Sequence, residues 1–295
     1  MEKSTIIPVL WIAENSNFGD ILSRYIVEHV TGLRAIQSNR NTAEKKLFAI
    51  GSIIDIREVF SEQNVIWGSG SIKALKYFGG KLFPINRFLL DKLFLLKNMS
   101  NTSRATVCAL RGALTRENLL KFGVDSPAIY GDPAILLPKY VKVDGSKARS
   151  GSVGLVVHLS HEKLLEIAEV YSKIDVKVIN IRRETNNDIE SFVQEMANCE
   201  RIFTSSLHGL IVAQVYDIPC LWFQVKHKRI HSSPNFKFWD YFTGTRQEIV
   251  SPIIVENLSK EAILYLKKQA CIKNNAVFMS DALLNAFPFK EFGLI

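Results

Sequence analysis

Short apolar runs alternate with amphipathic segments along the whole chain. The run Ile6–Ile12 is apolar on both faces, as expected of a strand buried in a parallel sheet. A turn-rich loop follows, and then residues 21–30, whose apolar positions recur at the spacing of a helix. This order of strand, loop and helix predicts an α/β fold with right-handed crossover connections.

The same pattern occurs twice, on either side of a polar, glycine-containing linker at residues 139–152. The further strands that we expect are Leu47–Ile50, Val65–Trp67, Thr106–Leu110, Ala128–Tyr130 (ending in a Gly-Asp-Pro turn), Val153–Val157, Val176–Ile181, Ile202–Phe203 and Cys220–Phe223. The main helices that we expect are Ala113–Phe122, Lys163–Tyr171, Asp188–Ala197 and Leu207–Tyr216. We therefore predict two doubly wound Rossmann-like domains, residues 1–145 and 146–259, facing each other across a cleft. A helical tail, residues 260–295, is expected to pack back on the first domain.

Small residues follow three successive strands of the first half. The loop at residues 14–20, the pair Gly51-Ser52 and the run Gly68–Ser71 each begin where an apolar run ends. Glycine and serine are common in tight turns, and they also let the backbone approach a ligand closely. Because the carboxyl ends of parallel strands meet at one edge of a sheet, their repetition favours a shared binding cleft.

The second half contains a strand, a hydroxyl-rich turn and a helix that begins near Leu207. His208 lies in the first turn of this helix, where free backbone N–H groups and the helix dipole attract anions. A histidine has a pKa near neutrality and can exchange protons there. The alternative is a core histidine that only satisfies a hydrogen bond.

Two charged residues of the first half also follow expected strands. Arg111 is placed to bind a carboxylate or a phosphate, and the alternative is an ion pair at the edge of the sheet. Asp132 precedes Pro133, where an aspartate more often caps a helix than binds a substrate hydroxyl. His158 and His161 are expected to be surface histidines, since a metal pair lacks a third ligand nearby.

The charge of the chain points to an anionic partner. Its 295 residues carry a formal net charge of +8. Cations are interleaved with aromatic residues in two stretches, 73–105 and 224–242, and such stretches suit sugars, phosphates or membrane surfaces. No nucleic-acid motif accompanies them, so we expect no nucleic-acid partner.

Localisation follows from what the sequence lacks. The four cysteines are far apart in the sequence, and we expect them to be reduced thiols. No apolar run approaches the ~20 residues of a membrane span. No signal peptide is recognisable at the start of the sequence. We expect a cytoplasmic protein, with contact to the inner face of the cell membrane left open.

Several motifs, in this order, resemble those of the polysaccharide pyruvyl transferase family. They are Asn17-Phe-Gly-Asp20, Gly68-Ser-Gly70, Arg111-Gly-Ala-Leu-Thr-Arg116, Gly131-Asp-Pro133, Thr204-Ser-Ser-Leu-His-Gly209 and Phe236-Lys-Phe-Trp-Asp-Tyr-Phe242. The resemblance implies a fold similar to B-type glycosyltransferases. It also implies transfer of the enolpyruvyl unit of phosphoenolpyruvate onto two hydroxyls of a sugar, as in capsule or exopolysaccharide synthesis. No redox cofactor, group-carrying cofactor or metal site is implied.

The resemblance also assigns roles to residues. His208 matches the family's catalytic histidine, and Arg111 matches a donor-binding arginine that would stabilise the departing phosphate. Family members often have arginine where this chain has Ser206, so we expect Lys228, Arg229 or Lys237 to supply the missing charge. The residues assigned to the donor are Ser205, Ser206, Leu207, Gly209, Lys228, Arg229 and Lys237. Those assigned to the saccharide acceptor, free or lipid-linked, are Asn17, Gly19, Asp20, Ser69, Gly70, Asp132 and Trp239.

Two other functions fit parts of the sequence. A glycosyltransferase or sugar-nucleotide epimerase would share the two-domain frame, and fold alone does not separate these enzymes. Such an enzyme needs an acidic residue for the ribose, for which Glu184 is a weak candidate. A non-enzymatic basic protein would bind through residues 73–105, and its binding would depend on salt but not on His208.

Overall fold

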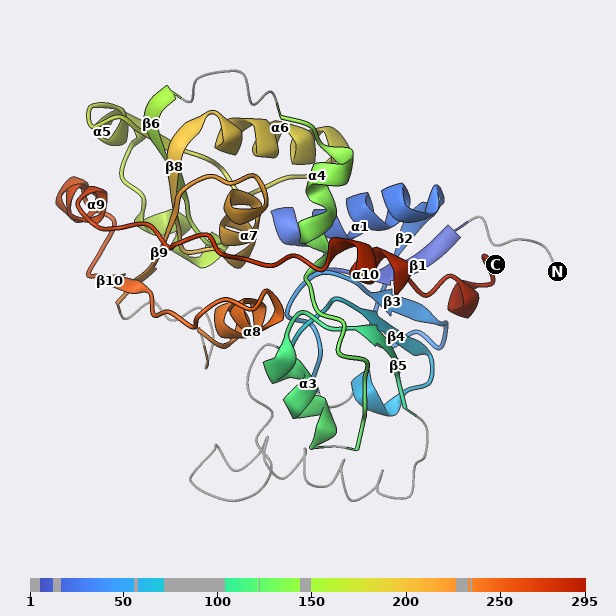
Figure 1. Ribbon diagram of the computed structural model, residues 1–295. Helices are drawn as coiled ribbons and strands as arrows, with labels where there is room; N and C mark the ends of the chain where they lie inside the picture. The colour runs from blue at the N-terminus through green and yellow to red at the C-terminus, as the bar shows by residue number, and fades with distance from the viewer. Residues whose placement is uncertain are drawn as a thin grey trace.

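Two parallel sheets form the frame of the molecule (Figure 1). The structure is a computed structural model, and it describes residues 6–12, 17–55, 58–71, 104–121, 123–143, 150–226, 233 and 235–295. Within these residues each sheet has five strands, all paired in parallel. The prediction of an α/β fold with parallel sheets is confirmed.

The two sheets have the same order of strands. The first is ordered β2-β1-β3-β4-β5, and the second β7-β6-β8-β9-β10, so the second strand of each half lies outside the first. The strands of the first sheet are β1 (Ile6–Leu10), β2 (Arg34–Ser38), β3 (Lys46–Phe48), β4 (Asn64–Trp67) and β5 (Thr106–Ala109). Those of the second are β6 (Ser150–Val156), β7 (Val176–Val178), β8 (Cys199–Thr204), β9 (Cys220–Val225) and β10 (Ile253–Val255). In both sheets the chain changes direction beside the first strand, which is where open α/β sheets bind ligands.

Helices cover the sheets and fill the space between them (Figure 1). The α-helices are α1 (Phe18–Thr31), α3 (Ala113–Leu120), α4 (Leu137–Tyr140), α5 (Ala168–Ser172), α6 (Asn186–Ala197), α7 (Leu207–Val215), α8 (Phe236–Gly244), α9 (Lys260–Lys267) and α10 (Ser280–Asn285). Short 3₁₀ helices are η2 (Glu58–Phe60), η3 (Pro133–Leu136), η4 (Leu159–Leu164) and η5 (Lys290–Phe292).

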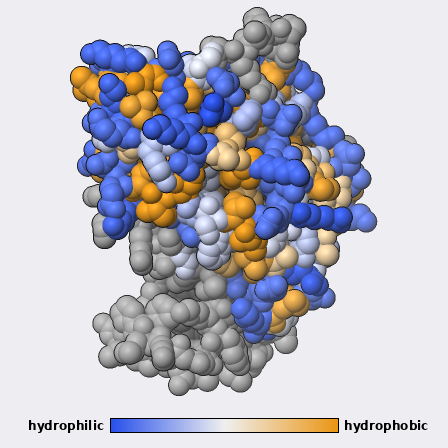
Figure 2. Space-filling model, turned by 60° about the vertical axis from the view of Figure 1, so that its left-hand side comes forward, coloured by the Kyte–Doolittle hydropathy of each residue, from blue (hydrophilic) through white to orange (hydrophobic). Residues whose placement is uncertain are grey.

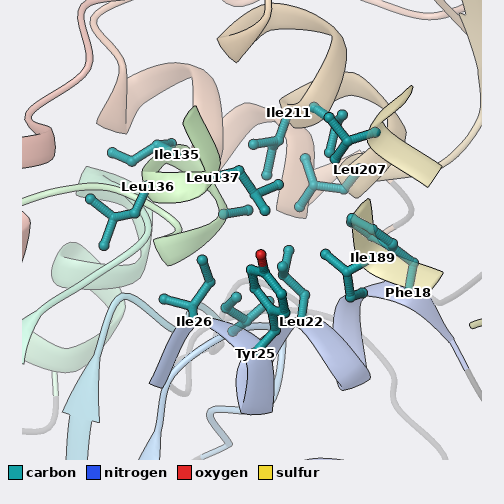
Figure 3. Close-up of a cluster of buried hydrophobic side chains, with 14 of the residues drawn as sticks. Phe18, Leu22, Tyr25, Ile26, Ile135, Leu136, Leu137, Ile189, Leu207 and Ile211 are labelled. Carbon is teal, nitrogen blue, oxygen red and sulfur yellow. The ribbon is translucent and has the colours of Figure 1, made fainter. Parts of the chain in front are cut away.

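Helices of both halves share one apolar cluster, shown in Figure 3. Leu22 and Ile26 of α1 lie across from Leu207 and Ile211 of α7 in this close-up. The rings of Phe18 in α1 and Phe192 in α6 are 4.2 Å apart at their centroids. Because one buried cluster connects α1 to α6 and α7, the two sheets hold a fixed relationship through their helices.

The C-terminal segment crosses from the second half to the first (Figure 1). The indole Nε1 of Trp67 in β4 donates to the carbonyl oxygen of Leu283 in α10 at 2.8 Å. The ring of Phe287 packs edge-on against Trp67, with centroids 4.9 Å apart. Lys139 and Asp281 add an exposed ion pair at 2.8 Å. The tail therefore contacts the first sheet through a buried hydrogen bond and a ring contact.

Two sequence predictions about elements are wrong. Residues 163–171 do not form one helix, because η4 ends at Leu164 and α5 begins only at Ala168. The buried hydroxyl of Tyr171 donates to the carbonyl of Leu258 at 2.6 Å and accepts from the backbone N–H of Glu166, which holds the intervening residues extended. Residues 128–130, expected to form a strand before the Gly-Asp-Pro turn, form only an isolated bridge between Leu110 and Tyr130, and η3 begins at Pro133.

Polar residues surround scattered apolar ones on the face shown in Figure 2. The large apolar side chains that are exposed come from separate elements, among them Ile167, Ile249 and Ile254. Among the described helices, none is both long enough and apolar enough to cross a membrane.

Candidate active site

His208 lies where the two halves of the chain come closest. Strand β8 ends at Thr204, and Ser205 and Ser206 lead into α7, so the imidazole emerges beside the carboxyl end of the sheet. In the first half, β1 leads in the same way to α1. Both connections lie at the point where the strand order of their sheet reverses.

Gly19 in the first turn of α1 leaves room for the imidazole. A Cβ atom placed on Gly19 would lie 2.1 Å from Cε1 of His208 and 2.2 Å from its Nδ1. No real Cβ approaches a ring so closely, so any larger residue would displace the histidine. The glycine that sequence analysis assigned to the acceptor is thus in direct contact with the proposed catalytic residue.

Asp132 faces His208 from the first half of the chain. Its Oδ1 caps η3 by accepting from the backbone N–H of Ala134 at 3.1 Å, so the capping prediction is confirmed. Its Oδ2 lies 3.8 Å from Nε2 of His208, which is beyond hydrogen-bond distance. Both atoms are shielded from solvent, and neither has a hydrogen-bond partner in the part of the chain that the structure describes. Two buried polar atoms without partners mark a place for a ligand or water.

Burial controls the protonation of this pair. Burial, together with the positive charges of Lys237 and Arg111, lowers the pKa of His208 to about 3. Burial also raises the pKa of Asp132 to about 6, against the backbone hydrogen bond from Ala134 and the charge of Arg111. The carboxylate of Asp132 is too far from the ring to offset burial. At neutral pH the imidazole is therefore uncharged and able to accept a proton.

Arg111 is completely buried and joins the two halves. Its Nε donates to Oδ2 of Asp240 at 2.9 Å, its NH1 to the Ser52 hydroxyl at 2.5 Å and its NH2 to the Ser71 carbonyl at 2.8 Å. Asp240 also accepts from the backbone N–H and the hydroxyl of Thr115, both at 2.7 Å. The ion pair that was left as the alternative is present. A direct contact between Arg111 and a donor stays a prediction.

Two glycines bring α8 against α3. A Cβ on Gly112 would lie 1.7 Å from the carbonyl oxygen of Asp240, and one on Gly244 would lie 2.1 Å from that of Arg111. Gly70 likewise leaves room for the guanidinium of Arg111, whose Cζ is 2.3 Å from the Cβ position. The contacts at Gly112 and Gly244 hold the middle and the C-terminal end of α8, the helix that carries Lys237, against the start of α3.

Lys237 is a buried cation in the first turn of α8. Only 8% of its surface is exposed, and its Nζ lies 5.6 Å from the ring centroid of Phe238. Burial, followed by the charge of Arg111, lowers the pKa of Lys237 to about 7. Within the described residues its ammonium group makes neither an ion pair nor a hydrogen bond.

The hydroxyl of Ser205 is engaged by two histidines. It accepts from the backbone N–H of His158 at 3.0 Å and lies 2.9 Å from Nδ1 of His161. The prediction that His161 lies at the surface is wrong, because its side chain is fully buried behind the turn before α7. Sequence spacing could not reveal this role, since Ser205 and His161 are 44 residues apart.

The remaining predicted residues surround the site to different degrees. Asp20 lies one residue after Gly19, its pKa is raised to about 6 by burial, and it accepts from the Asn17 amide at 3.2 Å. The hydroxyl of Ser69 is buried and has no partner in the described ranges. Trp239 is half-buried and donates to the carbonyl of Val250 at 3.2 Å. Lys228, Arg229 and residues 73–103 lie outside the described residues.

Metal ligands are not gathered in the part of the chain that the structure describes. No group of three or more histidine, cysteine, aspartate or glutamate side chains there is arranged to hold an ion. The four cysteines are free thiols.

Comparison with known proteins gives two matches. The family model for polysaccharide pyruvyl transferase matches residues 39–227, more than half of the chain. An uncharacterized protein of Acanthamoeba polyphaga mimivirus is 29% identical over 135 residues, which are 45% of this chain and 46% of that protein. The match therefore spans about half the length of this curated relative. Gly19, Lys237 and Asp240 all lie outside the range of the family model.

Proposed function

The chain belongs to the polysaccharide pyruvyl transferase family, and on that premise we propose that it forms a pyruvate ketal on a sugar. The donor is phosphoenolpyruvate, and the acceptor is a saccharide of a surface polysaccharide or its precursor. His208 moves the protons. This function requires a site that binds an anion, holds an acid–base group and excludes water.

One observation carries the proposal. Nε2 of His208 and Oδ2 of Asp132 face each other 3.8 Å apart, buried and without hydrogen-bond partners among the described residues. A histidine with a purely structural role would be expected to have its ring nitrogen satisfied. An unpartnered nitrogen beside an unpartnered carboxylate oxygen suits a site completed by substrate.

The chemistry needs one group that both donates and accepts protons. A proton added to the methylene carbon of phosphoenolpyruvate makes the adjacent carbon electrophilic, and a sugar hydroxyl then attacks that carbon. The bond to phosphate breaks, and a second hydroxyl closes the ketal ring. The methylene carbon gains one proton, the two hydroxyls lose one each, and the phosphate carries away the difference. His208 returns to its starting state within each cycle.

Donor binding would allow His208 to become protonated. Burial and nearby cations keep the imidazole neutral in the free protein. The carboxylate and phosphate of the donor carry negative charge, and such charge beside the ring raises its pKa. The protonated imidazole needed for the first step therefore forms only when the donor is present. Arg111 adds a positive charge close enough to act on His208.

The acceptor is proposed to approach from the first half of the chain. Asp20, Asn17 and Ser69 offer polar side chains on that side of His208, and Asp132 can accept from a sugar hydroxyl. A cleft like that of B-type glycosyltransferases is part of this proposal. So are a cytoplasmic location and contact with a lipid-linked acceptor at the membrane face.

The test is a direct assay of the reaction. The protein is incubated with phosphoenolpyruvate and saccharides that present two neighbouring hydroxyls, and acceptor-dependent phosphate release is measured together with the product mass. We expect a product that carries a pyruvate ketal. Transfer from a sugar nucleotide, with no reaction from phosphoenolpyruvate, would identify a glycosyltransferase instead.

His208→Ala tests whether the reaction depends on this histidine. It should lose turnover and keep its circular dichroism spectrum, because the ring nitrogen makes no structural hydrogen bond among the described residues. His29→Ala is the control, since His29 is an exposed histidine in the last turn of α1. Activity that survives in His208→Ala would show that the histidine is structural.

A further inference from the structure

We propose that Lys237 is the residue that binds the phosphate of the donor, and that Arg111 acts by holding α8 in place. This inference rests on the proposed function, since it names the residue that contacts a substrate of that reaction. It assigns the contact to α8, which lies outside the region matched by the family model.

Arg111 is already occupied. Each of its three side-chain nitrogens donates to a protein oxygen, and none of its surface is exposed. Because none of its surface is exposed, a ligand could reach the guanidinium only by opening this buried network. Separating Arg111 from Asp240 would leave a buried carboxylate without its cation, which is strongly unfavourable.

Lys237 has no counter-charge among the residues that the structure describes. The nearest acidic residue on its own helix is Asp240, one turn on, whose two oxygens accept from Arg111 and Thr115. Arg111, the charged residue that acts most on Lys237, repels it. A buried ammonium group without a partner is costly. It is explained if an anion completes the site.

The helices that carry Lys237 and His208 are joined, because the hydroxyl of Tyr241 in α8 donates to the side-chain oxygen of Gln214 in α7 at 2.9 Å. The charge of Lys237 also acts on His208 and lowers the pKa of the imidazole. Asp132, which faces the same ring, presents an oxygen without a partner among the described residues. An anion bound by Lys237 would therefore act on the protonation of His208. Phosphate fits better than carboxylate, because lysine acts as a point charge whereas the planar carboxylate favours arginine.

Buried contacts fix the position of α8, which carries Lys237. The ion pair between Arg111 and Asp240 and the contacts at Gly112 and Gly244 hold α8 against α3. Ser206, which precedes α7, is uncharged, and its backbone forms hydrogen bonds with the Thr204 hydroxyl. The cation for the donor therefore comes from another element.

The experiment measures binding of inorganic phosphate and of phosphoenolpyruvate by calorimetry near pH 6.5. Lys237→Met removes the charge and keeps an unbranched side chain. Lys121→Met, on an exposed lysine after α3, is the matched control. We expect Lys237→Met to weaken both ligands at least about tenfold, as for loss of a hydrogen bond to a charged group. Lys121→Met should bind like the wild type, and the Tm of Lys237→Met should not fall.

The outcomes separate this inference from the proposed function. Unchanged phosphate affinity in Lys237→Met would overturn it, even if ketal formation is found. Phosphoenolpyruvate that fails to compete with inorganic phosphate would overturn the assignment to the donor, and would indicate a phosphate on the acceptor. If phosphoenolpyruvate competes with inorganic phosphate in a way that depends on Lys237, but no ketal forms with any acceptor, the phosphate site is supported and the proposed reaction is wrong.

Discussion

Gly19 and His208 come from opposite halves of the chain and are in van der Waals contact, and the Cα atom of Gly19 faces the imidazole ring. The Cβ position of Gly19 is 2.1 Å from Cε1 of the ring, so a single methyl group would push the histidine away. Gly19→Ala should therefore reduce kcat by about 100-fold, as expected for a misplacement of about 1 Å. Steady-state kinetics with phosphoenolpyruvate would measure the loss.

The control for Gly19→Ala is Gly151→Ala. A Cβ on Gly151 would meet nothing within 4 Å, and the residue is exposed at the start of β6. Gly151→Ala should keep wild-type kinetics. Equal activity in both variants would mean that His208 can move without loss and does not need its observed position.

Asp132→Asn distinguishes the capping role of this side chain from its role beside His208. Asparagine keeps an oxygen that can cap η3, so the free energy of unfolding should change by less than about 1 kcal/mol. It removes the carboxylate that faces His208, so kcat should fall by about 100-fold or more while KM for the donor changes little. Asp125→Asn, at an exposed ion pair with Arg116, is the matched control and should leave kcat unchanged. An active Asp132→Asn enzyme would limit Asp132 to its capping role.

Arg111→Met should destabilise the fold strongly. The substitution leaves the carboxylate of Asp240 buried without its cation, at a cost of about 3–5 kcal/mol. Urea denaturation followed by fluorescence would measure the change. Arg111→Met combined with Asp240→Asn removes the lone charge and should recover part of the loss. If Arg111→Met is as stable as wild type, the ion pair does not hold α8.

The lowered pKa of Lys237 predicts how the free energy of unfolding changes with pH. Its folded pKa of about 7 lies below the ordinary value of 10.5, so between these values the unfolded chain binds more protons. The Lys237 charge therefore destabilises the fold most below pH 7, and this effect decreases as the pH rises toward 10. Lys237→Met should be more stable than wild type, by a margin that shrinks over this range, whereas a constant margin would contradict the low pKa.

The sequence predicted the strands inside both sheets and two of the four edge strands, β5 and β7. Strands β1 and β4 are largely apolar, and in β8 the buried Ile202 and Phe203 were recognisable. Strands β2 and β10 lie at sheet edges, and they were missed. Strand β2 reads Arg-Ala-Ile-Gln-Ser, in which only two positions are buried. Such a segment becomes a strand through pairing with its neighbour, which local sequence does not encode.

The sequence predicted which residues belong to the site, but not which residues they contact. Each of His208, Asp132 and Arg111 was placed after an apolar run, and the turn before α7 has the expected form. The partner of Arg111 is Asp240, 129 residues later, and no spacing rule connects the two. His161 was misjudged because it lies in a polar segment, although the chain folds it under the turn at Ser205. Long-range packing decided each of these cases.

The buried pair of Arg111 and Asp240 has a consequence for movement. Many two-domain enzymes close on their substrates by a hinge motion at the linker. Here such a hinge would have to separate α3 from α8, break an ion pair with no exposed surface and divide the apolar cluster between α1 and α7. The halves are thus locked against rigid-body opening, and substrates must enter a site that is already assembled. Adaptation to different acceptors then falls to local rotation of side chains around His208.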